Sequence, residues 1–186
     1  MSINPDFQAL CSDIEKIAFT CKRCGTCCRE TEPGSNVVMV GPGEVRPIMV
    51  KTGLTFDEVA EPYPDTIRED DKEYTLAWAI RREEGRCRFF KDGCCSIYDV
   101  RPWICRTYPF MLENGSIAIS SCNGVRLGQS QSAELTQVRQ LVTDLLDRQK
   151  AEEEEEERIV KVIGSVKIPA GQFVVIDGEG MRIIHG

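Results

Sequence analysis

The sequence predicts an α+β fold that contains a long helix and ends in a β-rich appendage. Apolar residues recur at helical spacing near both ends of the chain, whereas the middle has only short elements around clustered cysteines. From residue 159 onward, valine and isoleucine are punctuated by glycine and proline, which is typical of strands. We therefore predict a cysteine-cluster domain over 1–128, a long amphipathic helix over 129–158 and a β-rich appendage over 159–186.

Length and charge narrow the class of protein. The 186 residues suffice for one domain with an appendage, and 41% of them are hydrophobic. A net charge of -7 argues against a general nucleic-acid binder, which needs basic surface to neutralise phosphates. The N-terminus lacks the basic start and apolar run of a signal peptide, and no apolar stretch is long enough to span a bilayer. We expect a cytoplasmic protein without nucleic-acid or membrane partners.

The N-terminal residues predict an amphipathic helix over 5–19. Asn4 is its expected cap and Pro5 suits its first turn. Cys11 lies on the apolar face, so we expect it to be a small buried hydrophobe rather than a ligand. Cap and turn signals predict the short elements that follow: a helix after the turn at 41–43, a helix capped by Thr55 and Glu58, a strand over 74–80, a turn at 92–93, a helix opened by Pro102 and a hairpin around 114–115.

The C-terminal third begins with the longest predicted helix, over 132–157. It ends in six glutamates, 152–157, and acidic charge at a helix C-terminus opposes the macrodipole, so we expect this end to fray. Two or three strands follow, with a turn at Asp177-Gly178. So small a sheet needs support, either from the domain itself or from another protein. We expect these strands to dock a protein partner.

Two cysteine-rich stretches carry the chemistry. The first, "CKRCGTCC", has Cys21, Cys24, Cys27 and Cys28, and its two-residue gaps can direct successive sulfurs at one centre. In a reducing cytoplasm such clusters bind metal more often than they form disulfides. The only histidine is His185, which argues against mixed cysteine-histidine zinc fingers. The second stretch and its surroundings supply five further thiols: Cys87, Cys94, Cys95, Cys105 and Cys122.

Each stretch contains an adjacent pair of cysteines. In an extended chain, neighbouring side chains project to opposite sides and are poorly placed to bind one zinc ion. We therefore expect Cys21, Cys24 and Cys27 to share a local centre and Cys28 to turn toward a second centre or the other stretch. Cys105 and Cys122 are expected to join Cys87 and Cys95 around shared metal.

These residues resemble the YkgJ-type cysteine-cluster family, which has the motif C-x-x-C-x-x-C-C and is described as a zinc- or iron-chelating domain. The resemblance covers about residues 19–124, including "IYDVRPWICR" and a later "CNG". Cys94 is an extra thiol beside the expected Cys95, so either of them is a candidate ligand. By this resemblance the metal- or cofactor-binding residues are Cys21, Cys24, Cys27, Cys28, Cys87, Cys95, Cys105 and Cys122.

Thiolates suit both iron and zinc, and the sequence leaves both open. The C-x2-C-x2-C triplet and the surplus cysteines favour one or two iron–sulfur clusters of the 4Fe-4S type, with zinc as the alternative. The favoured function is an electron-transfer or cluster-carrying subunit of a larger redox or metallocentre-assembly complex. The alternative is a zinc-stabilised interaction module without redox activity. An enzyme, accessory to an oxidoreductase, has no catalytic constellation to support it. Arg101 and Arg106 flank Cys105, and their charge either favours a thiolate centre or forms surface ion pairs.

Overall fold

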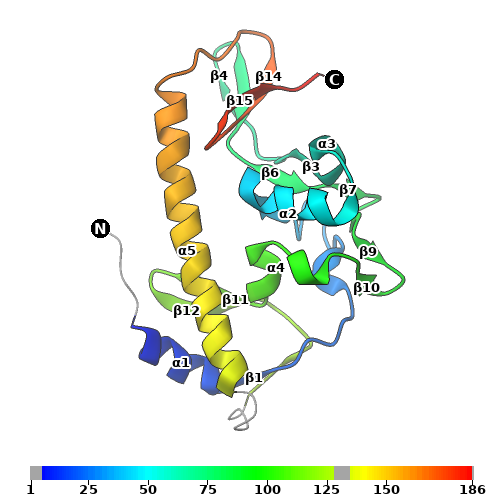
Figure 1. The fold of residues 1–186 in the computed structure, drawn as a ribbon, viewed down its shortest axis with the longest axis vertical. Coiled ribbons are helices and arrows are strands. Elements are labelled where there is room, and N and C mark those ends of the chain that lie inside the picture. The colour runs from blue at the N-terminus through cyan, green and yellow to red at the C-terminus, as the bar shows by residue number, and fades with distance from the viewer. Residues whose placement is uncertain (1–5, 128–134, 186) are drawn as a thin grey trace. The chain divides into compact units, whose positions relative to one another are not determined.

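The computed structural model describes residues 6–127 and 135–185, and its ribbon is shown in Figure 1. The mixed helix and strand content agrees with the predicted α+β class. The chain forms two compact units, each assembled from two separate segments. Unit 1 consists of residues up to 24 together with 103–151, and unit 2 of residues 25–102 together with 152–186. The division into 1–128, 129–158 and 159–186 follows chain order instead and stays a prediction.

Unit 1 combines two helices, a short helical turn of chain and two small antiparallel sheets. Strand β1 pairs with β13, and β11 forms a hairpin with β12. The hairpin turns at Asn114 and Gly115, both with positive φ, as the sequence predicted. Its elements are α1 (Phe7–Glu15), β1 (Ile17–Phe19), α4 (Trp103–Thr107), β11 (Phe110–Glu113), β12 (Ser116–Ile119), β13 (Val125–Leu127) and the first part of α5 (Leu135–Ile163).

Helix α1 is shorter than the predicted 5–19: it starts after Asp6 and ends at Glu15, and residues 17–19 form β1 instead. Its cap is Asp6, whose carboxylate accepts a hydrogen bond of 2.9 Å from the Gln8 backbone N–H. The predicted cap Asn4 and Pro5 lie outside the described residues. Cys11 is only 5% exposed, so the expectation of a buried thiol is confirmed. It belongs to the apolar core of this unit, formed by Leu10, Cys11, Ile14, Phe110, Val138, Val142 and Leu145.

Unit 2 is built on two larger sheets and two short hairpins. The strand order is β15-β14-β5-β4 in one sheet and β2-β6-β3 in the other, and β7-β8 and β9-β10 are the hairpins. The strands are β2 (Met39–Val40), β3 (Ala60–Pro62), β4 (Ile67–Glu69), β5 (Lys72–Thr75), β6 (Trp78–Ile80), β7 (Arg82–Glu83), β8 (Arg86–Cys87), β9 (Phe90–Lys91), β10 (Cys94–Cys95), β14 (Phe173–Asp177) and β15 (Gly180–Ile183).

Two helices of unit 2 begin close to the predicted signals: α3 after its predicted cap, and α2 within the predicted turn at 41–43. Gly41 precedes the first helix, and its N–H donates to the Glu44 carboxylate at 3.1 Å. Thr55 and Glu58 form the predicted capping box. These elements are η1 (Thr26–Cys28), α2 (Pro42–Thr52), α3 (Phe56–Val59), η2 (Tyr98–Val100) and the last part of α5.

The predicted strand over 74–80 is wrong in one respect: it is two strands that belong to different sheets. β5 ends at Thr75, the chain bends, and β6 begins at Trp78. The Trp78 indole N–H donates to the Asp177 carboxylate at 2.7 Å, and both side chains are buried. This buried hydrogen bond ties β6 to the end of β14, which a local alternation pattern could not reveal.

Helix α5 does not fray in the acidic run, and that expectation is wrong. The helix continues to Ile163, so the six glutamates lie inside it rather than at its end. Lys161 occupies the last turn, where positive charge complements the macrodipole. Glu155 accepts hydrogen bonds from Arg158 at 2.8 Å and from the Gly178 N–H at 2.7 Å. Within the described residues, no helix has both the length and the apolar character needed to cross a membrane.

The C-terminal strands are part of the sheet of unit 2. β14 lies between β15, with which it forms a hairpin, and β5, with which it pairs in parallel at Phe173–Val175. Val174 and Ile176 are fully buried with Tyr74, and Val162 packs against them. The sequence left open whether the domain itself or another protein supports these strands. In the structure, the domain itself supports them.

Candidate metal centre

All ten cysteines are free thiols, and they differ widely in environment. Four of them, Cys27, Cys28, Cys87 and Cys95, are partly buried and belong to unit 2. Cys94 of the same unit is exposed. The candidates in unit 1 are the exposed Cys21 and Cys24 and the partly buried Cys105 and Cys122.

Cys27 and Cys28 lie in the 3-10 turn η1 rather than in extended chain. Gly25 precedes the turn with a left-handed φ of 69°, and its Cα hydrogen faces the Phe90 ring so closely that a Cβ would clash. The two sulfurs are 3.9 Å apart. The expectation that this pair projects in opposite directions is therefore wrong, because it assumed an extended backbone.

Cys87 and Cys95 come from the two short hairpins that follow. The backbone N–H groups of Phe89 and Phe90 favour the Cys87 thiolate and that of Ile97 favours the Cys95 thiolate, which opposes the larger rise in the pKa of each thiol that burial causes. Both thiols pack against the apolar core that contains the buried Phe89 and Ile97. Burial raises the pKa of Cys87 and of Cys95. The charges of the two groups interact, which places them in the same neighbourhood.

Cys94 and Cys95 do follow the rule for extended chain. Both belong to β10, where Cys94 pairs with Lys91 and Cys95 pairs with Phe90. Successive side chains of a strand leave on opposite faces, so Cys94 is exposed while Cys95 turns inward. The structure thus places Cys95, rather than its neighbour, with the other inward thiols.

Cys27 is an acidic thiol. Its pKa is lowered from 9.0 to about 6, chiefly by the hydrogen bond with Cys28 and also by its own backbone N–H and the charge of Arg101. The Cys27 thiolate in turn raises the pKa of Cys95, although burial is the larger cause there. These interactions connect Cys27 with Cys95, and Cys95 with Cys87.

Arg101 is held by the loop that follows Cys95. Its Nε donates to the Tyr98 carbonyl at 2.9 Å, and its guanidinium stacks over the Tyr98 ring at 3.6 Å. The sequence placed Arg101 beside Cys105, whereas the structure directs its charge at Cys27 and Cys95. Arg106, the other candidate cation, stacks over Trp103 at 4.9 Å.

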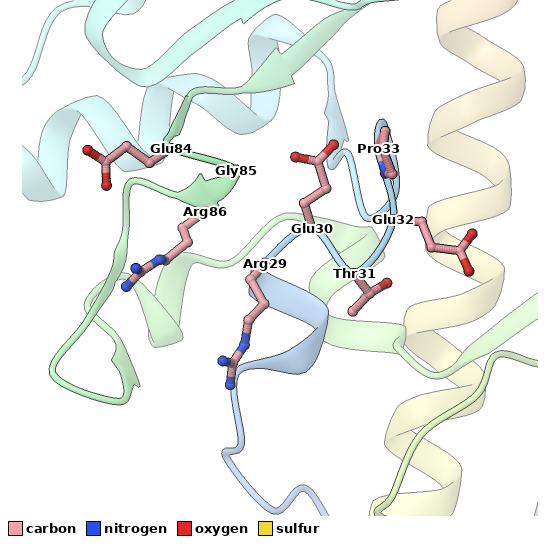
Figure 2. Close-up of a pocket in the computed structure, with 8 residues that line it drawn as sticks. All are labelled: Arg29, Glu30, Thr31, Glu32, Pro33, Glu84, Gly85 and Arg86. Atoms are coloured by element: carbon pink, nitrogen blue, oxygen red, sulfur yellow. The ribbon is translucent and has the colours of Figure 1, made fainter.

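A pocket of about 570 Å³ lies beside the cysteines but contains none of them. Arg29 and Arg86 face each other across a β-bridge, and Figure 2 shows their side chains extending in one direction. Because Arg86 and Cys87 are successive strand residues, the arginine face lies opposite the thiol. The pocket thus carries charge but no sulfur, and we assign it no part in metal ligation.

The residues fit a thiolate-bound metal in their chemistry. Two sulfurs on one tetrahedral zinc with bonds of about 2.3 Å are roughly 3.8 Å apart. The Cys27–Cys28 separation of 3.9 Å is close to this value. Across 6–127 and 135–185, no three cysteine, histidine, aspartate or glutamate side chains are yet close enough to enclose an ion. A metal site made of these four thiols would therefore need Cys87 and Cys95 to turn toward the pair.

Comparison with known proteins agrees with this chemistry. Fold and site define a class: an α+β protein with clustered free thiols. The chain belongs to the CxxCxxCC family, described as "Putative zinc- or iron-chelating domain", whose model matches residues 20–134. An uncharacterized protein of Methanocaldococcus jannaschii, MJ0661, is 27% identical over 155 residues, covering 77% of this chain and 78% of the relative. No solved structure matches the chain.

Proposed function

We propose that this protein is a metal-binding module in which Cys27, Cys28, Cys87 and Cys95 hold one zinc ion or one iron atom within unit 2. The 3.9 Å separation of the Cys27 and Cys28 sulfurs carries the proposal. Two thiolates at this distance suit a single ion, whereas a 4Fe-4S cluster assigns each thiolate to its own iron. The sulfur separation thus favours two thiolates on one metal ion over a 4Fe-4S cluster.

The zinc form is a structural one. Four thiolates close the coordination sphere of zinc, so the ion has no open position for substrate. Its ligands come from η1, β8 and β10, three short elements that bury little apolar surface of their own. Metal at this point would hold them together and present a defined surface to a protein partner.

The second candidate is electron transfer or cluster carriage in a larger redox or metallocentre-assembly complex. The same short sulfur separation suits two thiolates on one iron, either as a single iron atom or in a 2Fe-2S cluster. Iron would supply reversible one-electron chemistry. Arg101 places positive charge beside Cys27 and Cys95, which offsets the negative charge of four thiolates.

The surrounding chain prepares the sulfurs for either metal. N–H donors from Phe89, Phe90 and Ile97 point at Cys87 and Cys95 and stabilise their thiolates against the cost of burial. The acidic Cys27 is already ionised at neutral pH. Cys87 and Cys95, which have raised pKa values, release their protons on binding.

Anaerobic purification followed by metal analysis and absorption spectroscopy tests this function. The zinc form of the protein is colourless. A single thiolate-bound iron gives a charge-transfer absorption band, and an iron–sulfur cluster makes the protein brown. Cys95→Ser should lower the metal content, whereas the matched neighbour Cys94→Ser should leave it unchanged. Equal loss in both variants, or no metal in the wild-type protein, would contradict the proposal.

A protein partner at the C-terminal strands stays a prediction, and the structure limits where it could bind. β14 is paired on both sides, so β15 and β4 are the edge strands of this sheet. Ile183 on β15 is 38% exposed and Arg182 is exposed beside it. Ile183→Lys should leave metal binding intact while weakening co-purification with a partner, and unchanged co-purification would count against this edge.

A further inference from the structure

We propose that unit 1 contains a second, independent metal centre, formed by Cys21, Cys24, Cys105 and Cys122. It extends the thiolate chemistry of the proposed function to a different set of residues. The eight cysteines of the family resemblance divide equally between the units: these four belong to unit 1, and Cys27, Cys28, Cys87 and Cys95 belong to unit 2. Three sets of contacts inside unit 1 bring together the segments that carry these thiols. The sulfurs must still move closer to bind one ion, since no three ligand-type side chains of the described residues enclose one.

Antiparallel pairing brings Cys21 toward Cys122. β1 pairs with β13 through Phe19 and Val125, and the ladder continues as the Thr20 N–H donates to the Gly124 carbonyl at 3.1 Å. The approach at this point is so close that a Cβ on Gly124 would clash with the Thr20 carbonyl oxygen. Cys21 follows Thr20 directly, and Cys122 precedes Gly124 by two residues, so the two cysteines leave the same end of the ladder.

The helix α4 brings Cys105 to the same end. The Tyr108 hydroxyl donates to the Ser121 carbonyl at 2.7 Å, immediately before Cys122. Tyr108 continues the helical turn, because its N–H donates to the Ile104 carbonyl at 3.1 Å. Residues three apart share one helix face, so Cys105 lies on the face that Tyr108 directs at Ser121.

Cys24 is close to Cys21 in the sequence. Two residues separate them, and one of these, Arg23, has a left-handed φ of 51°. Two-residue gaps of this kind let successive sulfurs face one ion.

The Cys122 sulfur has a backbone hydrogen-bond donor. Its sulfur accepts a hydrogen bond from the Gly124 N–H at 3.4 Å. This contact parallels the donors that face Cys87 and Cys95 in unit 2. Such N–H groups stabilise a thiolate and fix its direction.

Two separate metal centres explain why the motif C-x-x-C-x-x-C-C has two halves. The boundary between the units falls between Cys24 and Gly25, inside the motif. The C-x-x-C half serves the centre of unit 1, and the adjacent pair in η1 serves the centre of unit 2. One short stretch of chain thus supplies two ligands to each centre, and the remaining pairs come from later in the sequence.

Metal stoichiometry of the full chain tests the second centre. Anaerobic reconstitution with zinc should give about two ions per chain, since each set of four thiolates closes one site. The double variant Cys105→Ser/Cys122→Ser should retain about one ion, and so should Cys87→Ser/Cys95→Ser. The control Cys94→Ser should retain about two. Loss of all metal from the first double variant would indicate one shared centre and overturn the proposal, as would retention of two ions.

Thiol protection in the wild-type protein gives a second measurement that does not depend on the folding of variants. The zinc-loaded chain is alkylated and the modified cysteines are mapped by mass spectrometry. Zinc should protect Cys21, Cys24, Cys105 and Cys122 together, while Cys94 reacts. Protection confined to the unit 2 thiols would reject the second centre and leave the proposed function standing, whereas no protection anywhere would reject both.

Discussion

Cys27 and Cys28 show how the conformation of a few residues decides what a thiol can do. The 3-10 turn places their sulfurs at 3.9 Å, close enough for a hydrogen bond that favours the Cys27 thiolate. In a strand the same two residues would face apart, as Cys94 and Cys95 do in β10.

The acidity of Cys27 leads to a prediction for the metal-free protein. Its pKa of about 6 means that its alkylation by iodoacetamide should rise with pH around that value, whereas Cys95, whose pKa is raised, should react only in more alkaline solution. Cys28→Ala should raise the pH midpoint for Cys27, because it removes the hydrogen-bond donor that is the largest cause of the shift. Mass-spectrometric alkylation rates from pH 5 to 10 give the measurement.

The same pKa predicts a pH dependence of stability. A thiol pKa that is lower in the folded chain contributes stability that is fully present above its ordinary value of 9.0. This contribution is lost as the pH falls through about 6. Arg101→Gln should reduce it by removing a positive charge. In the alkylation experiment, identical pH midpoints for Cys27 and Cys95 would show that the Cys28 hydrogen bond and the Arg101 charge do not lower the Cys27 pKa.

Gly25 matters at the scale of one element, the turn η1. Its left-handed φ favours glycine, and the Phe90 ring of β9 occupies the space where a Cβ would lie. The glycine therefore docks the Cys27–Cys28 turn against the β9-β10 hairpin that carries Cys95.

Gly25→Ala tests this docking, with Gly93→Ala as its matched control. Gly93 also has a left-handed φ, of 77°, but open space where its Cβ would lie. The control should cost about 1 kcal/mol of unfolding free energy from backbone strain alone. Gly25→Ala should cost more, roughly 2–4 kcal/mol, because the ring must also move. Urea unfolding measures both, and equal costs would mean that the Phe90 contact is unimportant.

At the scale of the whole molecule, metal and fold should be coupled. The sites do not exist in the unfolded chain, so binding free energy adds to the free energy of unfolding. Anaerobic chelation should lower the melting temperature and expose residues 87–105 to protease. Calorimetry and limited proteolysis check this, and unchanged melting after complete metal removal would contradict it.

The C-terminal strands belong to the fold of unit 2, which leads to a second prediction at this scale. Ile176 on β14 is fully buried, whereas Ile183 on β15 is 38% exposed. Ile176→Ala should cost about 2–5 kcal/mol of unfolding free energy, as large-to-small core substitutions do. Ile183→Ala should cost about 1 kcal/mol or less.

Deletion of residues 159–186 should destabilise unit 2 more than Ile176→Ala does, and should unfold it. It removes β14 from between β15 and β5, and it removes Val175 from the core against which Cys87 and Cys95 pack. Circular dichroism and metal analysis of the truncated chain give the measurement. A folded truncation with full metal content would instead show that the tail is a dispensable appendage.

The features that depend on near neighbours in the chain could be predicted from the sequence alone. The hairpin at Asn114-Gly115, the capping box of Thr55 and Glu58 and the burial of Cys11 follow from residues only a few positions apart. The cysteine spacing was also sufficient for the family, and with it zinc or iron chelation.

Which distant segments of the chain meet could not be predicted and is seen only in the folded structure. The parallel pairing of β14 with β5, the hydrogen bond from Trp78 to Asp177 and the inward turn of Cys95 depend on contacts between residues far apart in the chain. The division of the eight cysteines between two units has the same origin. Local backbone preferences are set by adjacent residues, but the partners of a strand or a thiol are set by the burial of the whole core, and no short stretch of sequence contains that information.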